Sequence, residues 1–416
     1  MSPRVEISDE QIRRWRKDTP GCTGGFPPFR HIHFNNAGAS LMPQPVLDAI
    51  VNHLGAEAEY GGYEAEDLAA GPIRETYVHL ARLLGAGRPE NIAVVENATV
   101  AVSQALSAFE FQPGDVLVTT HSDYTSNQIM YLSLARRRGL QVLYADDLPE
   151  GGVDPESVKK LAAHPRCRLV SLTWIPTNSG LVQAAEEVGE ICEAAGVPYV
   201  LDACQAVGQL PVDVARLHCD FLAGTARKFL RGPRGIGFLY VSDRALERGM
   251  APLFPDMRGA GLPGEDRFEL APDASRFENW EFPVALVLGL GAAARYALNN
   301  GIEKGSPRSI ALAADLRERL RALPGVEVAD VGSRLCAIVT IEARGWDARE
   351  LVRGLRQAGV NTSAANRGGG PLSRLGEERR PLLRISPHYY NTQEEIDELL
   401  GALEELLRRG PEAVHV

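Results

Sequence analysis

Short apolar runs alternate with amphipathic stretches along the first two thirds of the chain. Apolar residues at helical spacing predict helices over 45–60 and 71–84, and Gly61-Gly62 is expected to end the first of them. The apolar runs that we expect to be buried strands are 91–96, 115–120, 168–173, 197–201 and 238–241. Strands that alternate with helices in this way predict an α/β fold with a mostly parallel sheet covered on both faces.

The pattern changes after about residue 302. It predicts a helix over 308–323, strands over 326–331 and 336–342, and a helix over 348–358. Before the first strand lies a short amphipathic helix over 9–17 and a stretch rich in Pro and Gly. We therefore expect three parts: an N-terminal arm (1–30), a large domain (31–295) and a small C-terminal α+β domain (296–416).

Composition narrows the classes of function. The net charge of −10, without a Lys/Arg-rich block, argues against nucleic acid as a partner. The six cysteines show no paired spacing and no associated histidines, so neither a disulfide framework nor a metal site is expected. The polar first residues predict neither a signal peptide nor a membrane anchor, which favours a cytoplasmic location without membrane contact.

The chemistry concentrates between residues 201 and 240. Asp202 closes an apolar run, Gln205 follows three residues later, and Lys228 precedes the glycine-rich run GPRGIG. A lysine amine holds an aldehyde cofactor as a Schiff base, and a carboxylate keeps a pyridine nitrogen protonated. Gln205 is suited to donate to a phenolic oxygen of the ring. This order of residues predicts a site for pyridoxal 5′-phosphate, with Lys228 and Asp202 as its catalytic residues.

Two further segments carry groups that suit the cofactor's phosphate. Thr225 and Arg227 flank the predicted lysine, and a guanidinium binds phosphate in a bidentate manner. Ala98 and Thr99 lie where a predicted strand opens onto a helix, and a helix N-terminus offers free N–H groups to an anion. Phosphate binding by these four residues is therefore expected.

The Lys228 region resembles that of the class V aminotransferases, the family that includes cysteine desulfurases, isopenicillin N epimerase-like proteins and ergothioneine-pathway C–S lyases. The resemblance spans roughly residues 31 to 405 and implies the fold type I of pyridoxal-phosphate-dependent transferases. The family pattern has a histidine where this chain has Arg227. It also has a Glu-His pair, with the histidine stacked on the cofactor, where this chain reads Asp123-Tyr124.

The resemblance implies further roles. Tyr124 would offer the cofactor ring an aromatic face, and Thr177 lies in a Pro-Thr turn like that of epimerase-like members. Arg384, in the segment RISPHYYNTQEEID, would bind the substrate's α-carboxylate, for which a planar guanidinium is suited. Asn36 and Ala37 match a turn that lies beside the substrate.

The family is expected to form homodimers. Residues 276–298 resemble a segment that reaches the neighbouring subunit's cofactor phosphate, normally through a threonine, and Glu281 occupies that position here. Since a carboxylate repels phosphate, we expect Glu281 to pair with a cation instead.

Several reactions fit these residues. Persulfide-forming desulfuration is disfavoured, because residues 361–375 contain no cysteine to receive sulfur. We expect a C–S lyase that eliminates sulfur from a cysteine-derived amino acid, with an aminotransferase or an amino-acid epimerase as alternatives. A catalytically inactive binding protein of the same fold is a further alternative, against which the intact Lys228 and Asp202 argue. A nicotinamide-binding enzyme is disfavoured, because no G-x-G-x-x-G follows an early strand.

Overall fold

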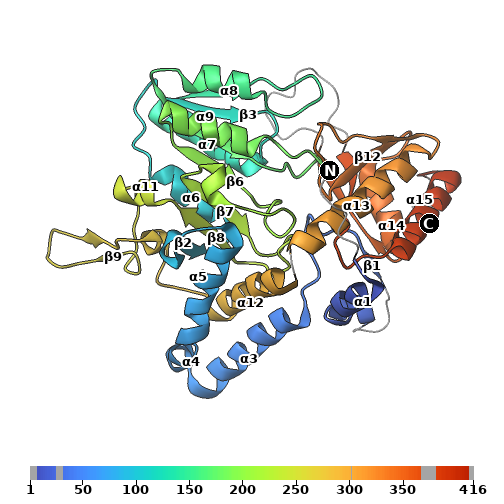
Figure 1. Ribbon diagram of the computed structural model, residues 1–416, viewed down its shortest axis with the longest axis horizontal. Helices are drawn as coiled ribbons and strands as arrows, with labels where there is room; N and C mark the ends of the chain where they lie inside the picture. The colour runs from blue at the N-terminus through green and yellow to red at the C-terminus, as the bar shows by residue number, and fades with distance from the viewer. Residues whose placement is uncertain (1–6, 25–30, 301, 367–380, 412–416) are drawn as a thin grey trace.

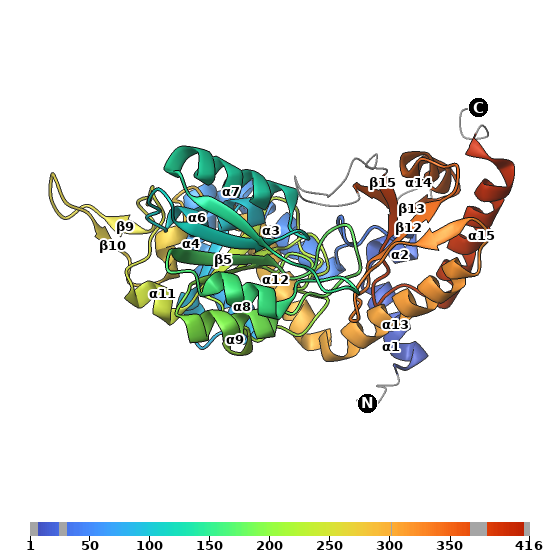
Figure 2. The ribbon, with the colours of Figure 1, turned by 90° about the horizontal axis from the view of Figure 1, so that it is seen from above.

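The computed structural model describes residues 7–24, 31–300, 302–366 and 381–411 of the chain. Two lobes lie side by side, a large one built on a seven-stranded sheet and a small one built on a four-stranded sheet (Figures 1 and 2). This arrangement confirms the predicted α/β fold with a smaller α+β domain. None of the helices in the described part of the chain is long and apolar enough to cross a membrane.

The large sheet is mostly parallel. Its strands, in spatial order, are β2 (Ile92–Val95), β8 (Gly237–Val241), β7 (Phe221–Thr225), β6 (Tyr199–Asp202), β5 (Cys167–Thr173), β3 (Val116–Thr120) and β4 (Gln141–Ala145). The five strands from β7 to β4 run parallel, and β8 runs antiparallel to both neighbours. Carboxyl ends of parallel strands meet at one edge, which is where open α/β sheets bind ligands.

Helices cover both faces of this sheet. They are α5 (Ala70–Leu84), α6 (Ala98–Ser107), α7 (Thr125–Arg138), α8 (Pro155–Ala162), α9 (Ala185–Ala195) and α12 (Val284–Asn300). Figure 2 shows α7 on one face and α8 and α9 on the other. Each face has its own apolar cluster, because successive strand residues point to opposite sides: Leu172 and Leu201 pack into one cluster, Leu169 and Val200 into the other.

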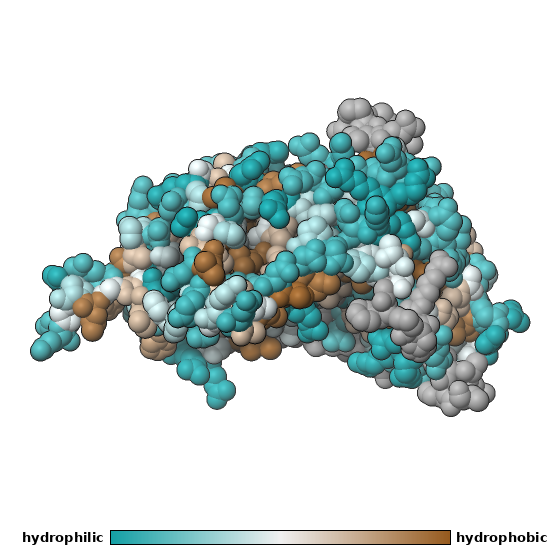
Figure 3. Space-filling model, turned by 90° about the horizontal axis from the view of Figure 1, so that it is seen from below, coloured by the Kyte–Doolittle hydropathy of each residue, from teal (hydrophilic) through white to brown (hydrophobic). Residues whose placement is uncertain are grey.

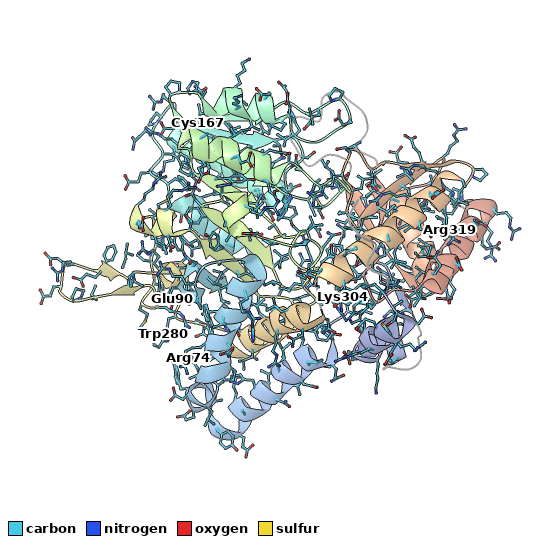
Figure 4. The ribbon with its side chains drawn as sticks, viewed as in Figure 1. Arg74, Glu90, Cys167, Trp280, Lys304 and Arg319 are labelled. Carbon is cyan, nitrogen blue, oxygen red and sulfur yellow. The ribbon has the colours of Figure 1, made fainter. Side chains whose placement is uncertain are left out.

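The small lobe is an antiparallel sheet covered by helices. Its elements are α13 (Ile302–Arg321), β11 (Val326–Val328), β12 (Val339–Ala343), α14 (Ala348–Gln357), β14 (Ser363–Asn366), β15 (Pro381–Ile385) and α15 (Gln393–Arg409), with the strands in the order β11-β12-β15-β14. Arg319 of α13 pairs with Asp397 of α15 at 2.7 Å (Figure 4). α13 therefore packs along the same side of the small lobe as α15.

Both predicted domain boundaries differ from the boundaries between the two lobes. β1 (Ile32–His33), expected in the large domain, pairs in parallel with β13 (Val360–Asn361) of the small lobe. The expected boundary between residues 295 and 296 falls inside α12, whose apolar face continues to Asn300. The start of the predicted large domain thus lies against the small lobe, directly before the Asn36–Ala37 turn.

Three short elements were not predicted from the sequence. α3 (Gln44–Tyr60) ends at Gly61 as expected, but α4 (Gly62–Leu68) begins at once, because Gly61 reverses the chain with φ 100°. A short helix, α2 (Pro20–Thr23), follows α1 (Asp9–Lys17) at the start of the stretch rich in Pro and Gly. Residues 250–272 contain a hairpin of β9 (Ala260–Gly261) and β10 (Glu269–Leu270).

The remaining short elements connect the sheets. They are the helices α10 (Val214–Leu217) and α11 (Asp243–Glu247) and the 3₁₀ turns at Pro89–Asn91 and Ala274–Phe277.

One buried arginine joins the arm to both lobes. Arg231, three residues after Lys228, donates to Thr19 Oγ1 at 2.6 Å and to Tyr389 Oη at 2.8 Å. Its guanidinium also lies 4.5 Å from the ring centroid of Tyr390 and 5.5 Å from that of Tyr296. A cation held by aromatic faces and hydroxyls fixes the turn after Lys228 against the small lobe.

Candidate active site

A cavity of about 410 Å³ opens at the carboxyl ends of β5, β6 and β7. All nine residues that the sequence assigned to the cofactor lie in its wall: Ala98, Thr99, Tyr124, Thr177, Asp202, Gln205, Thr225, Arg227 and Lys228. They come from segments that span 131 residues of sequence. Because each follows the end of a strand or opens a helix, the parallel sheet gathers them at one edge.

Lys228 differs from every other lysine of the chain. The sequence contains five lysines; four of them, Lys17, Lys159, Lys160 and Lys304, are exposed. Lys228 is 7% exposed. Its turn is closed by hydrogen bonds from Arg231 N to Lys228 O at 2.9 Å and from Gly232 N to Ala226 O at 2.8 Å. The backbone therefore presents this one amine to the cavity.

Gly208 makes room for that turn. A Cβ at this position would lie 2.3 Å from the backbone of Phe229, and its φ of 88° is unfavourable for other residues.

The surroundings of Lys228 favour its neutral form. Burial lowers the pKa of the amine below its ordinary value of 10.5, while the nearby carboxylate of Asp202 opposes the shift. No carboxylate of the described residues forms an ion pair with it. A neutral amine is the form that attacks an aldehyde.

Asp202 lies at the end of β6 with both carboxylate oxygens engaged. Oδ1 accepts the backbone N–H of Cys204 at 3.0 Å, and Oδ2 accepts Asn127 Nδ2 at 2.9 Å. The side chain is 5% exposed. Two donors on opposite oxygens fix the plane of a buried carboxylate that faces the cavity.

The opposite end of the cavity suits a phosphate. Asn97 caps α6 by accepting the N–H of Val100 at 3.0 Å, and the first N–H groups of the helix have no acceptor within it. Thr99 and Thr225 add hydroxyls. Arg227 donates Nη1 to the carbonyl of Gly38, so this arginine also ties the Asn36–Gly38 turn to the cavity wall.

A row of hydrogen bonds leads from the side-chain amide of Gln205 to the guanidinium of Arg384. Gln205 Nε2 lies 3.3 Å from Thr177 Oγ1, and Arg384 Nη1 donates to the same hydroxyl at 2.7 Å and to Thr177 O at 2.9 Å. Arg384 Nη2 lies 3.4 Å from both Asn35 Oδ1 and Ser363 Oγ. Arg384 is thus held from three segments of the chain.

Arg384 has the properties of an anion-binding residue. It is 6% exposed, its Nε is buried without a partner, and none of the described carboxylates pairs with it. Burial, followed by the nearby charge of Arg227, lowers its pKa to about 10. A buried cation without a counterion is costly, and a substrate carboxylate would relieve that cost.

Asn36 and Ala37, both predicted to lie beside the substrate, make different contacts in the structure. Asn36 is fully buried, donates to Ser386 O at 2.7 Å and accepts the hydroxyl of Tyr390. Its side chain is therefore used in packing the turn. Ala37 O accepts Gln205 Nε2 at 3.1 Å. It is Asn35, which the sequence prediction missed, that reaches Arg384.

Tyr124 lies beside the lysine. Its ring centroid is 5.9 Å from Lys228 Nζ, and its backbone N–H donates to Asp123 Oδ1 at 2.6 Å. An aromatic side chain thus lies where the sequence placed it. The sequence prediction gave no role to Asp123, Asn127 or Cys204. Asp123 occupies the position of the glutamate in the family's Glu-His pair, and the other two had only their proximity in sequence to Tyr124 and Asp202 as a signal.

These groups fit pyridoxal phosphate. Lys228 provides a buried amine for the aldehyde, Asp202 a carboxylate for the ring nitrogen and the start of α6 a cradle for the phosphate. Gln205 lines the same cavity, but its Nε2 donates to Ala37 O and only its Oε1 is left without a partner among the described residues, so donation to the ring's phenolic oxygen would require this amide to turn over. Among the described residues there is no cluster of three potential metal ligands.

Comparisons with known proteins agree with this geometry. The chain is 28% identical over 389 residues to a probable cysteine desulfurase of Methanothermobacter thermautotrophicus, covering 91% of this chain and 96% of that protein. It is 31% identical over 393 residues to the isopenicillin N epimerase of Streptomyces clavuligerus, covering 90% and 94%. Both relatives are matched over nearly their whole length.

The fold is shared with a solved structure. The apo cysteine desulfurase of Thermococcus onnurineus NA1 superposes with a TM-score of 0.85 at 25% identity, covering 95% of this chain and 98% of that one. The family model described as aminotransferase class-V matches residues 32–399. The chain therefore belongs to the aminotransferase class-V family, and it is an enzyme whose cofactor is pyridoxal phosphate.

Proposed function

We propose that this enzyme is a C–S lyase that releases sulfur from a cysteine-derived amino acid by β-elimination. The observation that carries the proposal is a buried lysine in the cavity wall together with a buried arginine, Arg384, which donates to Thr177 of the same wall and has no described carboxylate partner. Lys228 supplies a buried amine whose pKa is lowered by burial, and Arg384 supplies a cation for an α-carboxylate. The desulfurase relatives, named for removing sulfur from cysteine, support the substrate class.

The residues divide the work as follows. When bound, pyridoxal phosphate supplies an electron sink for the carbon next to the amino group. Arg384, held by Thr177, Asn35 and Ser363, orients the substrate through its carboxylate. Lys228 would remove the proton from the substrate's α-carbon, and Asp202 would keep the ring nitrogen protonated. The sulfur group then leaves from the β-carbon.

The chain offers the departing sulfur no suitable acceptor thiol. Residues 361–375 contain no cysteine, and residues 367–375 lie outside the described part of the chain. Cys204 does line the cavity, but burial raises its pKa well above the ordinary value. Because the thiolate is the nucleophile, a thiol kept protonated is a poor acceptor. We therefore propose that sulfur leaves with the departing group.

The overall reaction has a clear product signature. A cysteine S-conjugate and one water molecule yield a thiol, pyruvate and ammonium. The test incubates the holoenzyme with a panel of cysteine S-conjugates and sulfoxides, without a keto acid, and assays pyruvate and ammonium. Steady release of both in equal amounts is expected. Release of alanine from free cysteine instead would identify a desulfurase.

Epimerisation is the second candidate, because the 31% identical relative is an epimerase. An epimerase would exchange the α-proton of an amino acid with solvent deuterium and invert the centre without releasing pyruvate. An aminotransferase would lose its visible absorbance on adding an amino acid and recover it only with a keto acid. The same substrate panel distinguishes all three reactions.

We also propose a cytoplasmic homodimer. Apolar side chains are exposed on α3 and α4, including Val51, Leu54 and Tyr63, and on the β9–β10 hairpin. Figure 3 shows apolar patches on this face and on the protruding hairpin, and Figure 4 shows Trp280 and Arg74 on the same flank. Glu281 is exposed, without an ion pair in the described part of one chain, so its cation would come from the second subunit.

A further inference from the structure

A second buried carboxylate, that of Asp123, lies close to Asp202 and is connected to it through Asn127. Asp123, between β3 and α7, is 3% exposed and accepts hydrogen bonds on both oxygens. Thr173 Oγ1 donates to Oδ1 at 2.5 Å and Thr119 Oγ1 donates to Oδ2 at 2.8 Å. With the backbone N–H of Tyr124, three donors from three segments hold this carboxylate. So many donors are typical of an ionised carboxylate inside a protein.

A single amide connects the two carboxylates. Asn127 Nδ2 donates to Asp202 Oδ2 at 2.9 Å and to Asp123 Oδ1 at 3.2 Å, and the side chain is 2% exposed. An NH₂ group has two hydrogens, and here each meets a carboxylate oxygen. Asp123 therefore decides which end of the Asn127 amide faces Asp202, because turning the amide over would set its oxygen against both carboxylates.

We propose that Asp123 and Asn127 are positioning residues that act on the cofactor's ring nitrogen through Asp202. Asn127 fixes the plane of the Asp202 carboxylate, and Asp123 adds a second negative charge behind it. The proposal rests on the role of Asp202 in the proposed function. Neither residue needs to contact the substrate.

Opposing effects act on the charge of Asp123. Burial raises its pKa, the hydrogen bonds from Thr173 and Thr119 oppose that rise, and the nearby charge of Asp202 adds to it. The other titratable groups that face Asp123 are Tyr131 of α7 and Tyr144 of β4. Those that face Asp202 are Lys228 and Cys204. Burial raises the pKa of both tyrosines and keeps them neutral, so negative charge on this side of the cavity resides on the two carboxyl groups.

Three variants test the proposal. Asp123→Asn removes the charge and keeps the shape, Asn127→Leu removes the shared donor, and Thr119→Val removes one donor to Asp123 should either of the others fail to fold. Thr120→Val is the matched control, since its hydroxyl lies on the same strand and contacts Gln183 at 3.4 Å instead. Each holoenzyme is loaded with pyridoxal phosphate labelled with ¹⁵N in the ring.

The first measurement is the ¹⁵N chemical shift of the ring nitrogen across pH, and the second is the dissociation constant of the cofactor from each apoenzyme. Asp123→Asn should lower the pH at which the ring nitrogen loses its proton by about one unit. Asn127→Leu should weaken cofactor binding and lower kcat by about 10-fold, with little change in KM. Thr120→Val should match the wild type in all of these.

Wild-type ring-nitrogen shifts and cofactor affinity in both Asp123→Asn and Asn127→Leu would overturn the proposal. An unprotonated ring nitrogen in the wild type would overturn it too, together with the role of Asp202. If the wild type releases no pyruvate but the variants still shift the ring nitrogen, the inference stands and the proposed reaction fails.

Discussion

The hydroxyl of Thr177 lies 2.7 Å from Nη1 of Arg384 and 3.3 Å from Nε2 of Gln205. One small side chain thus touches both the amide expected against the cofactor and the arginine expected against the substrate carboxylate. The contact couples the alignment of the substrate to the cofactor, which is a requirement for cleaving one chosen bond at the α-carbon.

Replacement of Thr177 by valine tests this contact. Valine keeps the shape but removes the acceptor for both donors, while the backbone carbonyl of Thr177 still binds Arg384. One lost hydrogen bond to a charged group should raise KM about 10-fold, with a smaller fall in kcat. Steady-state kinetics measure both. Thr177→Ser, which keeps the hydroxyl, should remain near the wild type; equal losses in both variants would refute the coupling.

Arg384→Lys should weaken substrate binding more than it slows the chemical step. An ammonium cannot reach Thr177, Asn35 and a carboxylate together, as a planar guanidinium can. Loss of one charge-assisted hydrogen bond corresponds to a rise in KM of about 10- to 100-fold. The matched measurement is the affinity for a carboxylate-free amine analogue, which should be unchanged. A KM within twofold of the wild type would contradict the assignment.

The lowered pKa of Lys228 predicts the pH dependence of cofactor loading. The neutral amine reacts with the aldehyde, so the rate of reconstitution rises with pH as the ammonium loses its proton. Because burial lowers this pKa, the midpoint should fall below the ordinary lysine value of 10.5. Absorbance of apoenzyme mixed with pyridoxal phosphate at a series of pH values measures it. A midpoint at or above that value would show an exposed amine.

Arg231→Met should destabilise the fold without touching the cavity. The change leaves Thr19, Leu41 and Tyr389 without their donor and empties a site between tyrosine rings. We expect the free energy of unfolding to fall by about 3 kcal/mol, measured by urea denaturation. Arg234→Met, at an exposed arginine three residues on, is the control and should change it by less than about 0.5 kcal/mol. Equal falls in the free energy of unfolding in the two variants would refute the stabilising role of Arg231.

The sequence predicted the core of the site because the informative residues are close together in the chain. Asp202 and Gln205 follow one strand, and Lys228 follows the next strand along the sheet, so local order already implied their proximity. Ala98 and Thr99 were predictable for a related reason, since a strand that opens onto a helix has a fixed geometry. All of them line one cavity.

The residues that were missed interact across the sheet. Asp123 and Asn127 read as polar positions at the start of a helix, and only the packing of α7 over β5 and β6 brings them to Asp202. Asn35 was missed because neighbouring asparagines in a turn point in opposite directions. Sequence alone does not determine which of the two, Asn35 or Asn36, contacts Arg384.

The predicted boundaries were wrong where the hydrophobic pattern continued across the boundary between two domains. The apolar face of α12 runs past the expected domain boundary, so no polar break marks it. Strands β4 and β7 were missed because β4 is partly exposed and β7 carries Ala223 and Gly224, which weaken a strand pattern. The pairing of β1 with β13 joins residues more than 300 positions apart, beyond any local signal.

The most direct test of the account is the identity of the lysine that holds the cofactor. Borohydride reduction of the holoenzyme fixes pyridoxal phosphate permanently to its lysine. The reduced protein is then digested, and the modified peptide is identified by mass spectrometry. The account predicts the modification on Lys228 alone, since the other four lysines are exposed. Modification of Lys17, Lys159, Lys160 or Lys304 in its place, or of no lysine at all, would contradict it.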